Sequence, residues 1–236
     1  GDSYLANLTC KSRISTDLTP YTILSSTNSP FAFYIPDRFL SFSPERFVKV
    51  ENGIISSFPM KGTIDATLPD AEERILNNYK ESCEHATITD LIRNDIGMVS
   101  ENVWVERYRY IDKISTDRGE ILQVSSDIRG RIKPEYTNSL GSLIMSLLPA
   151  GSISGAPKRS TVELISKAEL LPRGFYTGVA GFFDGKILDS AVLIRYIEFD
   201  SYGNMFYRSG GGITINSNVE EEYSEMINKI YLPLNR

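Results

Sequence analysis

The residue best suited to chemistry is Lys61. It lies in a short apolar run, residues 57–63, that has a proline before the lysine and a glycine after it. A lysine in apolar surroundings loses solvation of its charged form, so its amine becomes nucleophilic nearer neutral pH. Lys61 is therefore a candidate nucleophile. The alternative is an ordinary surface charge, since the chain has 25 Lys and Arg residues and most such residues are solvated.

Two pairs of glutamates lie in segments that we predict to be helical, and within each pair the two glutamates are three residues apart. Glu81 and Glu84 form one pair, and Glu222 and Glu225 form the other. Residues at this spacing share a helix face, and two carboxylates that close repel each other unless a cation joins them. Two such pairs facing each other would suit Mg²⁺, which prefers carboxylate, water and substrate oxygens. The alternative for each pair is a solvated acidic face.

Arg195 lies within the apolar residues 191–197, for which we predict a strand. A buried charge is costly unless it is paired, so Arg195 needs an anionic partner. A protein carboxylate and a substrate carboxylate would both serve. Residues 149–158 are rich in glycine, serine and proline, and their amides could bind an anion at the start of the next helix. Such a segment is more often only a loop.

Composition narrows the class of protein. The chain has 236 residues, 41% hydrophobic and 23% charged, with a formal net charge of −5, as expected for a globular protein. The charge argues against non-specific nucleic-acid binding, so we expect a small substrate. Two cysteines are too few for a disulfide framework, and no apolar run is long enough to span a membrane, so we predict a cytoplasmic location. The first residue is not methionine, so we expect further residues upstream.

Strands and helices are both predicted to position these residues. Apolar alternation and turn signals predict strands at 4–15, 31–35, 39–43, 47–50, 102–111, 121–132, 175–183, 187–198 and 205–208. Helices are predicted at about 70–94 and 140–148, and from 217 toward the C-terminus. No internal repeat or linker stands out, so we predict one α+β domain over residues 1–236.

The chain resembles the chorismate-utilising enzymes, which include anthranilate, isochorismate, salicylate and aminodeoxychorismate synthases. The motifs that carry the resemblance are Ser43-Pro44-Glu45, Glu84-His85, 90–97, 151–158, Tyr176-Thr177-Gly178, Ile194-Arg195, 210–213 and 222–225. Residues 59–63, Pro-Met-Lys-Gly-Thr, are similar to a motif of aminodeoxychorismate synthase component I, whereas anthranilate synthases usually carry alanine in place of Lys61. The resemblance implies antiparallel β-sheets with flanking helices around a central active-site cleft.

The resemblance also implies a role for each matching residue. Lys61 would attack chorismate and form a covalent adduct that ammonia resolves, and Glu45 would protonate the leaving hydroxyl. Four glutamates would hold Mg²⁺: Glu84 and Glu225 directly, and Glu81 and Glu222 through water. The substrate-binding residues implied are Thr63, Ser154, Gly155, Tyr176, Arg195, Gly211, Gly212 and Lys229.

These roles lead to a hypothesis about function: chorismate and ammonia are converted to 4-amino-4-deoxychorismate for para-aminobenzoate and folate synthesis. A glutamine amidotransferase subunit, component II, would supply the ammonia. The alternatives are an anthranilate or isochorismate synthase and, in another class, a truncated binding module without catalysis. Gln123 stands where the family commonly has histidine, which puts any acid or base role at that position in doubt.

Overall fold

The computed structural model describes residues 2–116 and 119–232. Their contacts divide the chain into two compact units that alternate along the sequence. Unit 1 consists of Gly1–Glu45, Ile153–Ala180 and Ala191–Arg236, and unit 2 consists of Arg46–Ser152 and Gly181–Ser190. The single domain over residues 1–236 stays a prediction.

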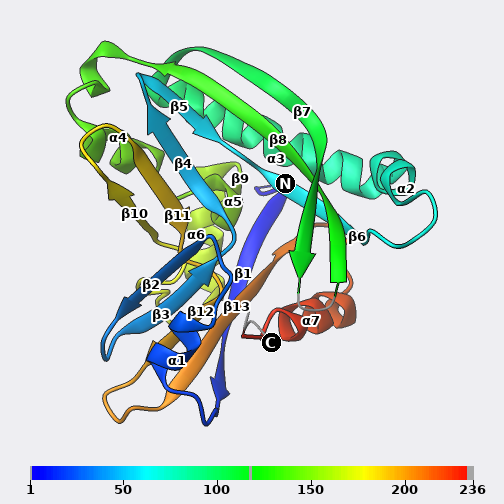
Figure 1. Cartoon of the computed structure of the whole chain (residues 1–236), viewed down its shortest axis with the longest axis vertical. Coiled ribbons are helices and arrows are strands. Elements are labelled where there is room, and N and C mark those ends of the chain that lie inside the picture. Colours follow the sequence, from blue (N-terminus) through cyan, green and yellow to red (C-terminus); the bar gives the residue numbers. More distant parts are fainter. Residues whose placement is uncertain (1, 117–118, 233–236) are drawn as a thin grey trace. The chain divides into compact units, whose positions relative to one another are not determined.

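Unit 1 is built on a six-stranded sheet in the order β2-β3-β12-β13-β1-β9 (Figure 1). Its strands are β1 (Leu5–Ile14), β2 (Phe31–Ile35), β3 (Phe39–Ser43), β9 (Gly155–Ala156), β12 (Tyr196–Phe199) and β13 (Met205–Ile213). Three helices accompany them: α1 (Pro20–Ser25), α6 (Lys158–Ala168), which contacts β1, and α7 (Val219–Asn228), which contacts β13. The longest pairing joins β1 to β13 in antiparallel register, so most of the main-chain pairing of the first strand is with the last strand.

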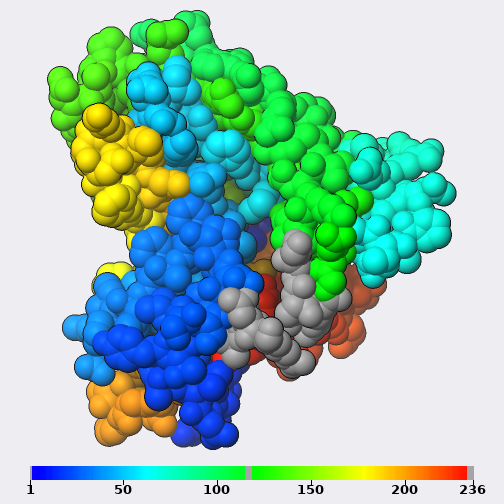
Figure 2. Space-filling model, viewed as in Figure 1, coloured from blue at the N-terminus to red at the C-terminus, as the bar shows by residue number. Residues whose placement is uncertain are grey.

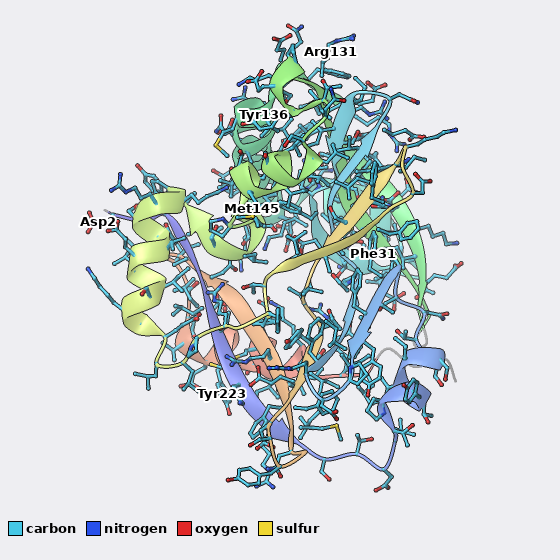
Figure 3. The ribbon with its side chains drawn as sticks, turned by 90° about the vertical axis from the view of Figure 1, so that its left-hand side faces the viewer. Asp2, Phe31, Arg131, Tyr136, Met145 and Tyr223 are labelled. Carbon is cyan, nitrogen blue, oxygen red and sulfur yellow. The ribbon has the colours of Figure 1, made fainter. Side chains whose placement is uncertain are left out.

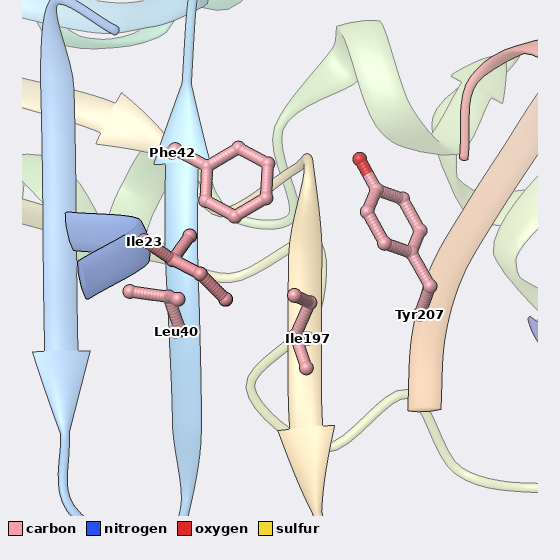
Figure 4. Close-up of a cluster of buried hydrophobic side chains, with 5 residues drawn as sticks. All are labelled: Ile23, Leu40, Phe42, Ile197 and Tyr207. Atoms are coloured by element: carbon pink, nitrogen blue, oxygen red, sulfur yellow. The ribbon is translucent and has the colours of Figure 1, made fainter. Parts of the chain in front are cut away.

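The core of unit 1 is formed by side chains from one helix and three strands. Figure 4 shows this cluster, in which Ile23 of α1 and Leu40 and Phe42 of β3 lie near Ile197 of β12 and Tyr207 of β13. All five are 0 to 1% exposed. Burying a large apolar side chain contributes about 1.5 to 3 kcal/mol, so this cluster holds the sheet and α1 together.

Unit 2 contains most of a seven-stranded sheet with the path β10-β11-β4-β5-β8-β6 and with β7 paired to β8. Its strands are β4 (Arg46–Glu51), β5 (Ile54–Ser57), β6 (Met60–Asp65), β7 (Ser100–Thr116), β8 (Gly119–Ile132), β10 (Val179–Phe183) and β11 (Leu188–Val192). The helices are α2 (Ala71–Asn77), α3 (Tyr79–Val99), α4 (Leu140–Leu147) and the 3₁₀ turn η1 (Pro134–Tyr136). The short α5 (Gly151–Ser154) lies where the chain passes from unit 2 to unit 1.

Two surface regions of unit 2 are the α2 region, shown in Figure 2, and the η1 and α4 region, shown in Figure 3. The α2 region, cyan in Figure 2, is on the surface, and most of its residues are exposed. Tyr136 of η1 and Met145 of α4 are labelled in Figure 3, and the hydroxyl of Tyr136 lies 3.2 Å from the Ser146 hydroxyl of α4. Among the described residues no helix is both long enough and apolar enough to cross a membrane.

The predicted fold class, α+β with antiparallel sheets, is confirmed. The predicted helix at 70–94 is wrong in one respect, because Asn78 adopts an extended conformation (φ −67°, ψ 111°) and separates α2 from α3. Asp70 is left-handed and makes no side-chain cap, whereas the Asn78 side chain accepts from the Glu81 amide. The strand predicted at 205–208 extends to Ile213, because Gly210 to Ile213 also pair with β1.

Candidate active site

A β-bulge in β6 presents Lys61. Met60 pairs with Ser125 of β8 and Thr63 pairs with Gln123, so three steps along β6 match two steps along β8. The extra residue falls at Lys61-Gly62, where Gly62 has φ +81°, a conformation that favours glycine. Bulges bend a strand locally and redirect its side chains. The glycine after the lysine thus belongs to the device that positions Lys61.

Helix α3 places its carboxylate pair beside this bulge. The Lys61 ammonium lies 2.9 Å from a carboxylate oxygen of Glu84. A Cβ added at Gly62 would come 3.0 Å from a carboxylate oxygen of Glu81, so the absence of a side chain leaves room for that glutamate. Unit 2 therefore brings together three of the predicted site residues, Lys61, Glu81 and Glu84, and Thr63 lies two positions after Lys61 on the same strand.

The apolar surroundings expected for Lys61 are not found. Its side chain is 46% exposed and ion-paired with Glu84, itself 35% exposed. An ammonium paired with a carboxylate is not a nucleophile, because its nitrogen lone pair carries a proton. The pair must separate, and the amine must lose that proton, before Lys61 can attack a substrate.

His85, next to Glu84, anchors α3 to the sheet. Its ring is 1% exposed, and its Nε2 lies 2.7 Å from the hydroxyl of Ser126 on β8. That hydroxyl also accepts from the Arg109 amide of β7. Burial, and to a lesser extent the positive charge of Arg109, lowers the pKa of His85 from 6.5 to about 4. His85 is therefore neutral at physiological pH and serves as an anchor.

Unit 1 repeats this arrangement with a glutamate pair on α7, a lysine directly after the helix and a glycine on β13. Lys229 lies 2.7 Å from a carboxylate oxygen of Glu225 and donates to the Gly210 carbonyl of β13 at 2.9 Å. Glu222 accepts from the Ser217 hydroxyl at 2.7 Å, and a Cβ at Gly211 would come 3.3 Å from its other oxygen. In both units the glutamate predicted to bind metal directly is ion-paired with a lysine, and the other glutamate of the pair lies against a glycine.

Arg195 lies in a break between β11 and β12, so the predicted continuous strand is wrong there. Its backbone has φ +50°, while its carbonyl still accepts from the Phe42 amide of β3. A left-handed non-glycine residue costs on the order of 1 kcal/mol and persists where its surroundings fix it. In the described part of the chain no carboxylate lies within ion-pair distance of Arg195. A protein carboxylate is therefore not its partner there.

Tyr176 is 5% exposed, and burial raises the pKa of its phenol to about 12 despite the nearby charge of Arg195. It therefore keeps its proton at neutral pH and can donate a hydrogen bond to an anion.

The remaining predicted residues of unit 1 are held by the main chain. The Glu45 amide donates to the Ser43 hydroxyl at 3.1 Å, and its carbonyl accepts from the Val192 amide, which fixes the end of β3. Ser154 is 2% exposed. Gly155, with φ +128°, pairs with Ala6 of β1 and has no space for a side chain.

The carboxylate donors fit a hard cation such as Mg²⁺. Over residues 2–116 and 119–232, however, no cluster of three or more His, Cys, Asp or Glu side chains could hold a metal. Mg²⁺ therefore stays a prediction.

Sequence reasoning missed Tyr231, whose hydroxyl accepts from Arg195 Nε at 3.1 Å. The available signal was an aromatic residue two positions after Lys229.

Comparisons with known proteins show the family to which the chain belongs. Residues 1–235 match the chorismate binding enzyme family. An uncharacterized PabA-like protein of Haemophilus influenzae is 51% identical over 99% of this chain and 71% of its own length. Anthranilate synthase component 1 of Acetivibrio thermocellus is 34% identical over 97% of this chain, and aminodeoxychorismate synthase component 1 of Bacillus subtilis is 31% identical over 98%.

A solved structure agrees with these relatives. Anthranilate synthase component I of Streptococcus pneumoniae superposes with a TM-score of 0.80 at 28% identity, over 97% of this chain and 52% of that one. This chain spans 48% of the Acetivibrio protein and 51% of the Bacillus protein, so it corresponds to about half of those relatives.

Proposed function

This chain belongs to the chorismate binding enzyme family, and on that premise we propose that it is the catalytic part of an aminodeoxychorismate synthase component I. The reaction is chorismate plus ammonia to 4-amino-4-deoxychorismate plus water. The observation that carries the proposal is Lys61, presented by the β6 bulge 2.9 Å from Glu84. A glutamine amidotransferase subunit would supply the ammonia.

In the proposed mechanism Lys61 Nζ bonds to the ring carbon at the other end of the conjugated diene from the carbon that carries the departing hydroxyl. That hydroxyl leaves as water with a proton from Glu45, and the ring double bonds shift. Ammonia then bonds to the carbon that lost the hydroxyl, and Nζ departs with its electron pair. Arg195 and Tyr176 would hold a substrate carboxylate, the arginine through its two terminal nitrogens.

Glu84 and Glu225 are the proposed direct ligands of Mg²⁺, with Glu81 and Glu222 acting through water. When bound, Mg²⁺ would supply positive charge to balance a substrate carboxylate. Each proposed direct ligand is also ion-paired with a lysine ammonium, Glu84 with Lys61 and Glu225 with Lys229.

An anthranilate-type reaction is the second candidate, because anthranilate synthases are as similar to this chain as the aminodeoxychorismate synthase is. The two readings differ in their product. An enzyme that uses a lysine adduct places the amino group where the hydroxyl left, whereas direct attack by ammonia on the carbon that the lysine would otherwise attack gives the 2-amino isomer. The third reading, a binding module without catalysis, predicts no product.

Product analysis with the full-length protein, chorismate, ammonium and Mg²⁺ tests the proposal. We expect the 4-amino product, a covalent adduct in intact-mass spectra when ammonia is omitted, and loss of that adduct in Lys61→Ala. Lys49→Ala is the matched control, since Lys49 also lies in a strand of unit 2 with its ammonium 2.6 Å from a glutamate, Glu51. An unchanged 4-amino product and rate in Lys61→Ala would refute the role of Lys61.

A further inference from the structure

The surroundings of Arg195 are aromatic. In the described residues its guanidinium has a single hydrogen-bond partner, the Tyr231 hydroxyl, which accepts from Nε at 3.1 Å. The guanidinium carbon lies 5.4 Å from the centre of the Tyr231 ring, within cation–π range. Tyr231 therefore contacts Arg195 through both its hydroxyl and its ring.

Arg195 and Tyr231 line one cavity of unit 1, about 590 Å³ in volume. The other residues of its wall come from α7 and the position after it: Glu220, Glu221, Ser224, Glu225, Asn228 and Lys229. The charge of Lys229 is balanced by Glu225 at 2.7 Å. Arg195 is thus the cation of this cavity that has no carboxylate at ion-pair distance in the residues described.

We propose that Tyr231 is a positioning residue, which holds the Arg195 guanidinium so that its two terminal nitrogens are free to bind a substrate carboxylate. This inference rests on the proposed function, because it concerns the substrate grip of that reaction. With Nε occupied by Tyr231, the remaining donors form the planar fork that matches a carboxylate. The phenol supplies orientation without neutralising the charge, whereas an aspartate or glutamate at the same place would compete with the substrate.

A double-mutant cycle separates positioning from packing. Chorismate affinity is measured by calorimetry, with Mg²⁺ present, for the full-length wild type, Tyr231→Phe, Arg195→Lys and the double variant. We expect Tyr231→Phe to weaken binding about five- to tenfold, which corresponds to one hydrogen bond of about 1 to 1.4 kcal/mol. In the Arg195→Lys background the same change should have less than about a twofold effect. Equal losses in both backgrounds, or no loss in either, would overturn the inference.

A second measurement does not depend on chorismate. In ¹⁵N-labelled protein, the Arg195 Nε–H signal is assigned by its loss in Arg195→Lys, and its exchange with water is followed. Tyr231→Phe should speed this exchange severalfold. Tyr202→Phe is the matched control, since Tyr202 is 89% exposed and removal of its hydroxyl should change neither readout.

The two measurements separate the two hypotheses. Rapid exchange in the wild type, or exchange unaltered in Tyr231→Phe, overturns the positioning role. Failure of the wild type to bind chorismate refutes the proposed function, while the exchange rate still decides whether Tyr231 holds Arg195.

Discussion

His85 should make the fold sensitive to mild acid, and the size of the effect can be worked out. Its ring is 1% exposed, its Nδ1 has no hydrogen-bond partner in the described residues, and its pKa is lowered from 6.5 to about 4. Between these values the unfolded chain binds a proton at this site and the folded chain does not. Stability therefore falls as the pH drops from about 6.5 to about 4. A gap of about 2.5 pH units corresponds to about 3 kcal/mol.

The assay is urea unfolding of the wild type and His85→Gln at pH 7, 6, 5 and 4.5. Glutamine can still bond to the Ser126 hydroxyl but cannot titrate, so carboxylates elsewhere contribute equally to both proteins and cancel in the difference. The wild type should lose about 2 kcal/mol more than the variant between pH 7 and 5. Parallel curves over this range would refute the reasoning, since they would mean that the buried ring is protonated as readily as in the unfolded chain.

Two further results are expected. Gly155→Ala should lower the free energy of unfolding in urea by about 3 kcal/mol or more, because the new Cβ would overlap a main-chain carbonyl of β1. The control is Gly53→Ala, which should cost about 1 kcal/mol, because Gly53 has φ +74° but nothing within 4 Å of the new Cβ. Similar losses in the two variants would contradict the packing argument. Glu84→Gln should weaken Mg²⁺ binding in calorimetry more than Glu81→Gln, because a direct ligand loses more than a water-bridged one, and equal losses would count against the assigned roles.

Sequence reasoning succeeded where local chemistry decides the structure. The turn between β4 and β5 forms at Asn52-Gly53, a dipeptide that by itself predicts a tight hairpin because both residues accept positive φ. The helix break at Asn78 was missed, although an asparagine three residues before a glutamate can cap a helix and does so here. The sequence contained that signal, but the prediction gave more weight to the helical pattern on either side.

Other features depend on contacts between distant segments and could not be predicted in this way. The residues around Arg195 look like an uninterrupted strand, and only the bonding of its carbonyl to β3 and the kink at φ +50° show that the strand stops. The ion pair between Lys61 and Glu84 likewise depends on how α3 packs beside the β6 bulge. Such packing reflects the whole fold, which a short pattern does not contain.

The pairing of β1 with β13 has a consequence for synthesis on the ribosome. Ile14 pairs with Met205, so the first strand waits for roughly 190 further residues, or about 10 to 40 s at the usual rate of translation. Throughout that interval β1 has an unpaired edge, which is a template for aggregation. Lys11 and Arg13 lie on this strand, and charged residues at a strand edge discourage pairing with another chain.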